Sequence, residues 1–288
     1  MTTSAKEPYA TFSPDELASL PTVFRDGLFL DRVIAVTGGA GVIGTALCVL
    51  FGRLGATVVA CGRSRDRLDE LSRHLTRLAV RHSTHALTVR DPEQVAAFVD
   101  EIWERHGRLD VLVNNAGGQF AVPATELTPK GWSAVVETIL YGTWYASQAA
   151  ARRWIGENAP GSIVNVTTVP GFVAVGIPHT VAARAGQVQL TRALALEWTP
   201  HSIRVNAVAV GVVSGPSLHH YPPSAKPFFE ANPMRRTGDV VDVAEACAYL
   251  SAPSGKFLTG VVLPVDGGGS VWGEFWPLGK PDYFRIED

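Results

Sequence analysis

The feature that most constrains this chain is a glycine-rich turn at residues 37–44 (TGGAGVIG), which lies between a short apolar run and a segment with helical apolar spacing. Gly39, Gly41 and Gly44 form the pattern G-x-G-x-x-G in the strand–loop–helix context that gives this motif its meaning. The first glycine permits a tight turn, the second lets the backbone approach a pyrophosphate, and the third lets helix and strand pack closely. We therefore predict a dinucleotide site, with a plain glycine-rich turn as the alternative. Its predicted contact residues are Gly38, Gly39, Gly41, Val42 and Ile43.

Strand-like and helix-like segments alternate along the chain from Arg32 onward. We expect strands at residues 33–36, 57–61, 109–113, 162–166, 203–208 and 261–265, and helices at residues 42–54, 65–79, 91–106, 128–151, 180–198 and 240–250. This alternation predicts an α/β fold, a single-domain Rossmann-type sheet that is parallel and doubly wound, with helices on both faces. The expected division is an N-terminal arm at 1–30 with a short helix capped by Ser13, a Rossmann domain at 31–270 and an aromatic tail at 271–288.

Composition excludes several other classes of protein. Hydrophobic residues make up 46% of the chain and charged residues 18%, which is too apolar for a disordered protein. The net charge of −2 offers no electrostatic footprint for nucleic acid, and the sequence has no uncharged apolar stretch of membrane-spanning length. Cys48, Cys61 and Cys247 are scattered among apolar neighbours, which argues against a disulfide framework and suits a reducing compartment. We expect a cytoplasmic protein without nucleic-acid or membrane partners.

The residue that follows the second predicted strand bears on the choice of cofactor. Dinucleotide folds often place an acid there to bind the ribose 2′-hydroxyl. This chain has Arg63 instead, and a guanidinium is suited to a 2′-phosphate. The sequence therefore favours NADP(H) over NAD(H), unless Arg63 is only an exposed surface residue.

Five motifs resemble the short-chain dehydrogenase/reductase family, over about residues 28–270. They are Thr37-Gly38-x-x-Gly41-x-x-Gly44, Asn114-Asn115-Ala116-Gly117, Asn165-Val166-Thr167-Thr168, Arg204-Val205-Asn206 and Val265-Asp266-Gly267-Gly268. Within the family, the stretches at 24–29, 118–120, 130–132 and 182–198 are similar to peroxisomal-type trans-2-enoyl-CoA and 2,4-dienoyl-CoA reductases. The resemblance implies a nicotinamide cofactor and assembly into homotetramers or homodimers through the long helices at 129–152 and 180–198. The further cofactor-binding residues that it implies are Asn115, Ala116, Gly117, Arg184 and Gly211.

Typical members of that family carry an Asn-Ser-Tyr-Lys tetrad, in which the Tyr exchanges the alcohol proton and the Lys acidifies it. The four corresponding positions here are all substituted, by Ile139, Thr168, Thr180 and Arg184. Ile139 cannot hold the water that the Asn holds, and Thr180 cannot act as a general acid near neutral pH. Arg184 keeps a positive charge but will not give up its proton. Three lesser departures are Thr88 for an adenine-binding Asp, Val210 for the Pro of a Pro-Gly pair, and Val42 for the second loop glycine.

These substitutions favour one kind of reduction over another. Ketone reduction makes an alkoxide and needs a strong, positioned proton donor. Conjugate reduction of an enoyl thioester instead develops negative charge on the thioester oxygen, which hydrogen-bond donors can stabilise. The candidate catalytic residues for that purpose are Thr168, His179, Thr180 and Arg184, with a structural role at the helix start as the alternative for His179. Gln119 is expected to line the same cleft, and Tyr141 or Tyr145 is a less favoured substitute acid.

Residues 212–236 correspond to the segment that covers the substrate in the resembling family, and here they are rich in proline and aromatic residues. His219 and His220 are adjacent on one loop without a nearby carboxylate cluster, so we expect no metal site. An apolar lid over the substrate is the preferred interpretation. The aromatic tail, with Trp272, Phe275 and Trp276, is expected to close over the cleft or to pack on a neighbouring subunit.

The preferred hypothesis is an NADP(H)-dependent reductase that acts on a small molecule with an activated alkene, such as an enoyl-CoA or carrier-bound thioester. One alternative is a scaffold of the same family used for non-redox chemistry, as a lyase, isomerase, cyclase or hydrolase. The other is a catalytically silent subunit that partners an active homologue. The fold does not separate these hypotheses, because function depends on the site that the fold carries.

Overall fold

A seven-stranded parallel sheet forms the centre of the molecule. The computed structural model describes residues 11–272 apart from 170, 172–173 and 221–231, and the sheet order is β3-β2-β1-β4-β5-β6-β7. The strands are β1 (Val33–Thr37), β2 (Thr57–Gly62), β3 (His82–Ala86), β4 (Val111–Asn114), β5 (Gly161–Thr168), β6 (Ile203–Val210) and β7 (Val262–Val265). The predicted doubly wound parallel sheet is confirmed.

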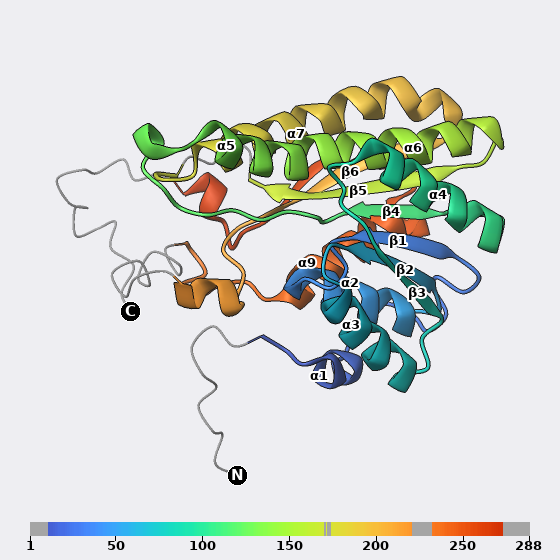
Figure 1. The fold of residues 1–288 in the computed structure, drawn as a ribbon. Helices are drawn as coiled ribbons and strands as arrows, with labels where there is room; N and C mark the ends of the chain where they lie inside the picture. Colours follow the sequence, from blue (N-terminus) through green and yellow to red (C-terminus); the bar gives the residue numbers. More distant parts are fainter. Residues whose placement is uncertain (1–10, 170, 172–173, 221–231, 273–288) are drawn as a thin grey trace, which may run out of the picture.

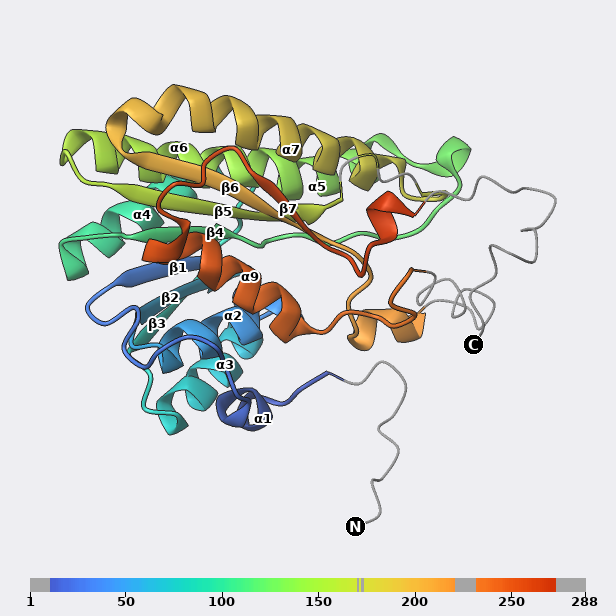
Figure 2. The ribbon, with the colours of Figure 1, turned by 180° about the vertical axis from the view of Figure 1, so that it is seen from behind.

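Helices cover both faces of this sheet. Figure 1 shows α4, α5, α6 and α7 above the sheet and α2, α3 and α9 below it, with α1 at the outer side of the lower layer, and the reverse view in Figure 2 shows the same three layers. Their bounds are α1 (Pro14–Ser19), α2 (Val42–Arg53), α3 (Arg65–Arg77), α4 (Pro92–His106), α5 (Pro129–Val136), α6 (Gly142–Gly156), α7 (Pro178–Trp198) and α9 (Val240–Ser251). Short 3₁₀ turns lie at Ala124–Glu126, Thr199–His201, Pro216–His220, Pro253–Gly255 and Gly269–Val271.

Two apolar cores hold the layers together, one on each face of the sheet. Side chains along a strand point alternately to the two faces, and β1 follows this rule. Ile34 and Val36 belong to the core between the sheet and the layer of α2 and α9. Val33 and Ala35 belong to the core between the sheet and the layer of α4 and α6. All five residues of β1 are buried, so the central strand is apolar on both faces. This explains why the run before the glycine-rich turn has no polar alternation.

The long helix expected at 128–151 is interrupted in the structure. Helix α5 ends at Val136, a π-helix (η2) spans Glu137–Tyr141, and α6 begins at Gly142. The Gly142 N–H bonds to the Glu137 carbonyl five residues earlier, which is the π-helical pattern. The prediction of one continuous helix is therefore wrong in its backbone geometry. Single π-turns inside α-helices are frequent at functional sites, and this one contains Ile139.

Strand β3, which pairs with β2 at one edge of the sheet, has no counterpart among the predicted elements. Its sequence is HSTHA, without the apolar run or alternation that indicates a strand. His82 bonds to the Ser72 hydroxyl at 2.8 Å, and His85 lies 3.2 Å from the Glu101 carboxylate. These contacts satisfy the polar side chains of an edge strand, and a search for apolar patterns does not detect this strand.

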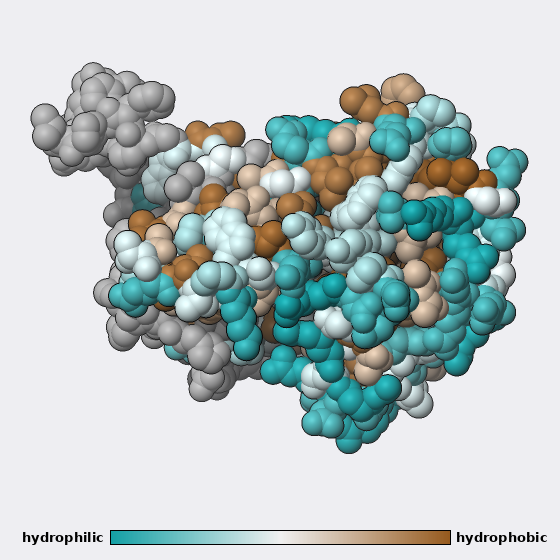
Figure 3. Space-filling view, turned by 45° about the horizontal axis from the view of Figure 1, so that its top comes forward, coloured by the Kyte–Doolittle hydropathy of each residue, from teal (hydrophilic) through white to brown (hydrophobic). Residues whose placement is uncertain are grey.

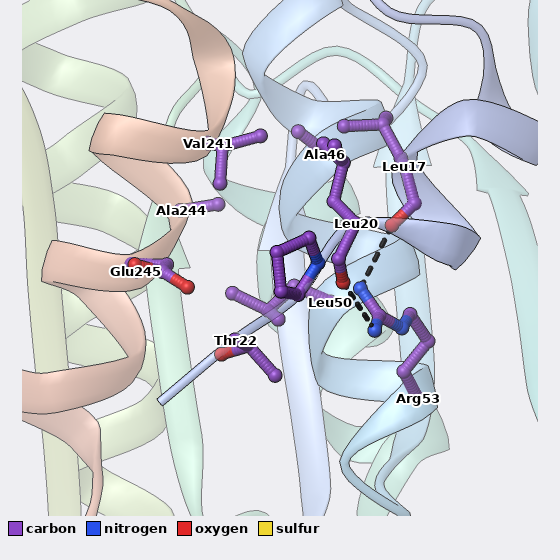
Figure 4. Close-up of a pocket in the computed structure, with 10 residues that line it drawn as sticks. Leu17, Leu20, Thr22, Ala46, Leu50, Arg53, Val241, Ala244 and Glu245 are labelled. Carbon is purple, nitrogen blue, oxygen red and sulfur yellow. Dashed lines mark hydrogen bonds between the residues drawn. The ribbon is translucent and has the colours of Figure 1, made fainter. Parts of the chain in front are cut away.

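The described part of the N-terminal arm is fixed to the back of α2. Ser13 caps α1 in a reciprocal pair with Glu16, as the sequence predicts. Arg53 of α2 donates to the carbonyls of Leu17 and Leu20 at 2.8 and 2.7 Å, as Figure 4 shows. The groove between α1, α2 and α9 holds only about 10 Å³, which is room for roughly one water molecule. It is a packing seam and not a ligand pocket.

The surface of the helical layer is mixed in character. In Figure 3 hydrophobic patches over this layer are interspersed with hydrophilic residues. Exposed apolar side chains of the layer include Trp132 of α5, Ile155 of α6 and Leu196 of α7. None of the helices in the described ranges is both long enough and apolar enough to cross a membrane.

Candidate active site

The site lies where the strand order reverses, between β1 and β4. The chain proceeds from β1 outward to β2 and β3, and from β4 outward in the other direction to β5, β6 and β7. Thr37 and Asn114 are paired at the carboxyl ends of the two central strands. Ligands of open α/β sheets bind at this kind of switch point. The loops at this edge gather at the left of Figure 1.

The glycine-rich turn is built so closely that side chains are excluded from it. Gly38 has a φ of +64°, and a Cβ on it would lie 2.9 Å from the Ala116 Cα. A Cβ on Gly44 would lie 2.2 Å from the Gly38 carbonyl oxygen. Gly41 caps α2 without a side-chain hydrogen bond, so the first amides of the helix are not capped by this residue. A cradle with uncapped helix amides and closely packed glycines fits a pyrophosphate.

The loop after β4 is tied to this turn. The Thr37 hydroxyl accepts hydrogen bonds from the backbone N–H groups of Asn115 and Ala116, each at 3.1 Å. The Asn115 amide donates to the carbonyls of Thr37 and Gly38, also at 3.1 Å. These four bonds fix the two walls of the crevice relative to each other. Asn115 and Ala116 therefore lie beside the glycine-rich turn, where the resemblance puts two cofactor contacts.

Arg63 and Thr88 lie at the ends of the neighbouring strands. Arg63 follows β2, is exposed, and has no hydrogen bond or ion pair within the described ranges. The Thr88 hydroxyl accepts from the Arg90 N–H at 3.3 Å, so it closes the turn before α4. Arg63 is therefore a cation near the turn that has no partner in the described ranges. A side chain that binds a 2′-phosphate would need to be free in this way.

The far wall of the crevice is formed by the ends of β6 and β7. The Gly211 N–H donates to the Val265 carbonyl at 3.0 Å, and a Cβ on Gly211 would lie 2.9 Å from the Asp266 Cα. Val213, near the start of segment 212–236, forms a bridge with Gly238, two residues beyond its end. The lid itself remains a prediction, because residues 221–231 lie outside the described residues. The same holds for the tail beyond Trp272.

His179 is fully buried in the first turn of α7. Its Nδ1 accepts a hydrogen bond from the Thr180 backbone N–H at 2.8 Å, and the Thr180 hydroxyl lies 3.4 Å from the same nitrogen. Because Nδ1 is an acceptor, the neutral ring carries its proton on Nε2, which is then a donor. Nε2 is buried and has no hydrogen-bond partner within the described structure. The Phe120 ring packs edge to face on His179, with centroids 4.8 Å apart.

Arg184 lies five residues further along α7. Its Nη1 donates to the Val166 carbonyl and, at 3.1 Å, to the Gln187 side-chain oxygen. Its Nε is buried and has no hydrogen-bond partner within the described structure. A Cβ on Gly117 would lie 2.7 Å from Nη2, so the guanidinium packs directly against that glycine. Burial lowers the pKa of Arg184 to about 10, which leaves the group positively charged at neutral pH.

One loop therefore covers both of these donors. Gly117 contacts Arg184, and Phe120, three residues later, contacts His179. Gln119 is exposed in the same loop. The structure thus brings His179 and Arg184 together under residues 117–120, although they are not hydrogen-bonded to each other.

The other tetrad positions have distinct surroundings. Thr168 is the last residue of β5, at the carboxyl edge of the sheet, and is half-buried. Ile139 is fully buried in a small apolar cluster with Val135 and Ala183. Thr180 is also buried, and the hydrogen bonds described above direct it to His179. Ile139 is therefore surrounded by hydrocarbon side chains, at the position where the resemblance implies an amide.

The two tyrosines proposed as substitute acids lie in the interrupted helix. Tyr141 is the last residue of the π-helix and is exposed, whereas Tyr145 lies in α6 and packs partly against the core on that face. Their ring centroids are 6.2 Å apart. No contact between either ring and His179 or Arg184 is seen in the described ranges, and their role as acids stays a prediction.

Sequence reasoning missed a buried polar chain behind Arg184. Gln187 donates from its amide to the Thr143 hydroxyl at 2.8 Å, and Thr143 donates to the Ile139 carbonyl at 2.7 Å. Both side chains are buried. The available signal was the spacing of polar residues along α7 at positions 184, 187 and 191, on a helix face that should otherwise be apolar.

A metal site finds no support in the described ranges, which contain no group of three or more His, Cys, Asp or Glu residues that could hold an ion. Cys48, Cys61 and Cys247 are buried free thiols, and burial raises the pKa of each of them. Such thiols are chemically inert. The polar chemistry of the described site therefore rests on hydroxyl, imidazole, guanidinium and amide groups.

Comparisons with known proteins agree with this fold. A family model described as enoyl-(acyl carrier protein) reductase matches residues 38–270. A probable 2,4-dienoyl-CoA reductase of Bacillus subtilis is 33% identical over 249 residues, which are 82% of this chain and 96% of the relative. The 3-oxoacyl-[acyl-carrier-protein] reductase of Thermotoga maritima is 33% identical over 239 residues, covering 82% of this chain and 97% of the relative. A solved citronellol catabolism dehydrogenase of Pseudomonas aeruginosa superposes with a TM-score of 0.77 at 32% identity, over 86% of this chain and 99% of that one.

Proposed function

The chain belongs to the short-chain dehydrogenase/reductase family, and on that premise we propose that it is an NADP(H)-dependent reductase of activated alkenes such as enoyl-CoA-like thioesters. The observation that carries this proposal is the pair of buried donors beneath loop 117–120, His179 Nε2 and Arg184 Nε, which have no hydrogen-bond partner in the described structure. Buried polar groups are nearly always satisfied, so two unpaired donors under one loop of the candidate site indicate that a ligand oxygen belongs there.

The residues present fit a nicotinamide dinucleotide. The glycine-rich turn is packed too closely to admit a Cβ at Gly38, Gly39 or Gly44, and the uncapped start of α2 suits the pyrophosphate. Arg63 is positioned after β2 to pair with a 2′-phosphate, which favours NADP(H). Arg184 takes the place of the family lysine beside the nicotinamide ribose.

Conjugate reduction suits the donors of this site. A reduced nicotinamide, when bound, supplies a hydride to the β-carbon of the alkene, and negative charge then develops on the thioester oxygen. His179 donates from Nε2 to that oxygen, and the charged Arg184 and the Thr168 hydroxyl lower the energy of the same charge. Thr180 holds His179 in the donor tautomer through its backbone N–H. The proton for the α-carbon comes from solvent.

Ketone reduction is disfavoured by the same geometry. It needs a general acid at position 180, and Thr180 is a buried threonine whose hydrogen bonds go to the neighbouring imidazole. The relatives include reductases of 2,4-dienoyl-CoA and of 3-oxoacyl carrier protein, which are reactions of these two different kinds. The loss of the acid is the reason to prefer the alkene.

The proposal is tested by measuring NADPH oxidation with enoyl-CoA and dienoyl-CoA substrates, beside a 3-oxoacyl thioester. His179→Phe removes the donor but keeps an apolar ring, and we expect kcat to fall roughly 100-fold or more while NADPH affinity stays unchanged. His179→Gln keeps an N–H donor and should recover part of the rate. Turnover that is unchanged in His179→Phe contradicts the assignment.

The same assay separates the two alternatives. Tight NADPH binding without turnover on any thioester favours non-redox chemistry on this scaffold. Absence of NADPH binding, measured by fluorescence or thermal shift, favours a catalytically silent subunit. The homotetramer or homodimer implied by the family is tested by light scattering.

A further inference from the structure

A row of polar side chains runs along the buried face of α7. Arg184, Gln187 and Thr191 follow one another at helical spacing, and Gln187 and Thr191 have no solvent exposure. Thr191 accepts from the Asn165 amide at 2.9 Å and donates to the Gln187 carbonyl at 2.8 Å. A helix face packed on a sheet is normally apolar. Polar groups retained there need a reason beyond packing.

The hydrogen bonds of this row leave the Gln187 amide only one orientation. The Thr143 hydroxyl donates its proton to the Ile139 carbonyl at 2.7 Å and therefore receives the Gln187 Nε2 donor at 2.8 Å. The amide oxygen is then turned toward Arg184 Nη1 at 3.1 Å. The opposite orientation would set an NH₂ group against a guanidinium, which has no acceptor.

This arrangement decides which edge of the guanidinium is available. Both protons of Nη1 are engaged, one by the Val166 carbonyl and one by Gln187. Nε is buried without a partner, and Nη2 lies against Gly117 without a hydrogen bond in the described structure. Nε and Nη2 form the edge of a guanidinium that binds two adjacent oxygens at once. The edge without hydrogen bonds therefore faces Gly117, and Gln187 engages Nη1.

We propose that Gln187 is a positioning residue for Arg184: with Thr143 it fixes the guanidinium so that the Nε–Nη2 edge receives two adjacent oxygens of the bound cofactor. The proposal rests on the proposed function in one respect, the identity of the ligand. The Gln187 amide is engaged at both ends, by Arg184 and by Thr143, so Gln187 acts through Arg184.

The test compares one substitution at two positions of α7. Gln187→Met keeps the size of the side chain but removes its acceptor, and Gln189→Met makes the same change at an exposed position of the same helix. We expect NADPH affinity, measured by fluorescence titration, to fall about tenfold or more in Gln187→Met and to change less than twofold in Gln189→Met. Gln187→Glu, which keeps an acceptor for Arg184, should remain within about threefold of the original protein.

Coupling to Arg184 distinguishes positioning from general damage to the fold. Arg184→Met should weaken NADPH binding, and the double variant Arg184→Met/Gln187→Met should bind no more weakly than Arg184→Met alone. Additive losses in the double variant, or affinity unchanged in Gln187→Met, would overturn the proposal.

A measurement without cofactor keeps the proposal separate from the proposed function. In the ¹⁵N spectrum, the two Nη groups of Arg184 should be distinct in the original protein because rotation about the Cζ–N bonds is restricted. They should merge in Gln187→Met and stay distinct in Gln189→Met. If the protein does not bind NADPH but its two Arg184 Nη signals are distinct, the proposed function and the ligand assignment are refuted. The positioning of Arg184 by Gln187 then still stands. Merged signals in the original protein refute the positioning.

Discussion

The contact between Gly117 and Arg184 gives the most direct test of the site geometry. In Gly117→Ala the new methyl group would lie 2.7 Å from Arg184 Nη2, whereas carbon and nitrogen atoms normally stay about 3.5 Å apart. The guanidinium must therefore move by roughly 0.8 Å. Such a shift would displace the guanidinium from the position that its bonds to Val166 and Gln187 fix.

The size of the effect follows from the loss of one hydrogen bond between Arg184 and the cofactor. A hydrogen bond to a charged group contributes about 1.5–3 kcal/mol, so Gly117→Ala should weaken NADPH binding about 10- to 100-fold if Arg184 meets the cofactor. Replacement of glycine also stabilises the chain by about 0.4–1 kcal/mol through the unfolded state, which offsets part of the loss in melting temperature. Binding should therefore change more than stability does.

The neighbouring glycine provides a matched control. A Cβ on Gly118 would meet no atom within 4 Å, and neither Gly117 nor Gly118 has a positive φ. Gly118→Ala should consequently bind NADPH as the original protein does and melt at the same or a slightly higher temperature. Titration of both variants by NADPH fluorescence is the assay. Equal affinities for Gly117→Ala and Gly118→Ala would refute the contact on which the argument depends.

Three further perturbations test other parts of the molecule. Arg63→Ala should reduce the preference for NADPH over NADH roughly 10- to 100-fold, as measured by titration with each cofactor, and equal losses for both would contradict a 2′-phosphate contact. Ile139→Asn introduces the amide that the resemblance implies but buries it among hydrocarbon side chains. We expect the free energy of unfolding, measured by thermal melts, to fall by about 2–4 kcal/mol, and kcat not to rise. An unchanged melting temperature would count against the apolar cluster. Arg53→Met removes two charge-assisted hydrogen bonds to the arm. Amide hydrogen exchange of residues 14–19 should therefore accelerate, while NADPH affinity stays constant. Unaltered exchange would show that these bonds do not hold the arm.

The sequence allowed the centre of the fold to be predicted because its signals there are local. The glycines at 38, 39 and 44 are required by backbone contacts a few residues away or on the adjoining strand, and the apolar run of β1 is buried on both faces. The resemblance to the family then made His179 and Arg184 candidate site residues. The structure shows that both lie under one loop, which no linear pattern indicates.

Other features depend on contacts between distant segments and were not predictable from local pattern. The π-helix at Glu137–Tyr141 has ordinary helical composition, and β3 consists of polar residues that find partners on α3 and α4. Gln187 is separated from Thr143 by 44 residues, so its role appears only when α7 packs beside α6. A polar residue on a helix is more often solvated, and local sequence does not distinguish the two cases.

The buried bond between Arg184 and Gln187 also limits how this site can evolve. A change of Gln187 to an apolar residue leaves a guanidinium proton unsatisfied in the interior, and a change of Arg184 to an apolar residue leaves the amide oxygen unsatisfied. Each single step away from the pair passes through a less stable protein, whereas the two changes together need not. Loss of the pair is thus a coupled substitution, and descendants of this chain are expected to keep or lose both residues as a unit.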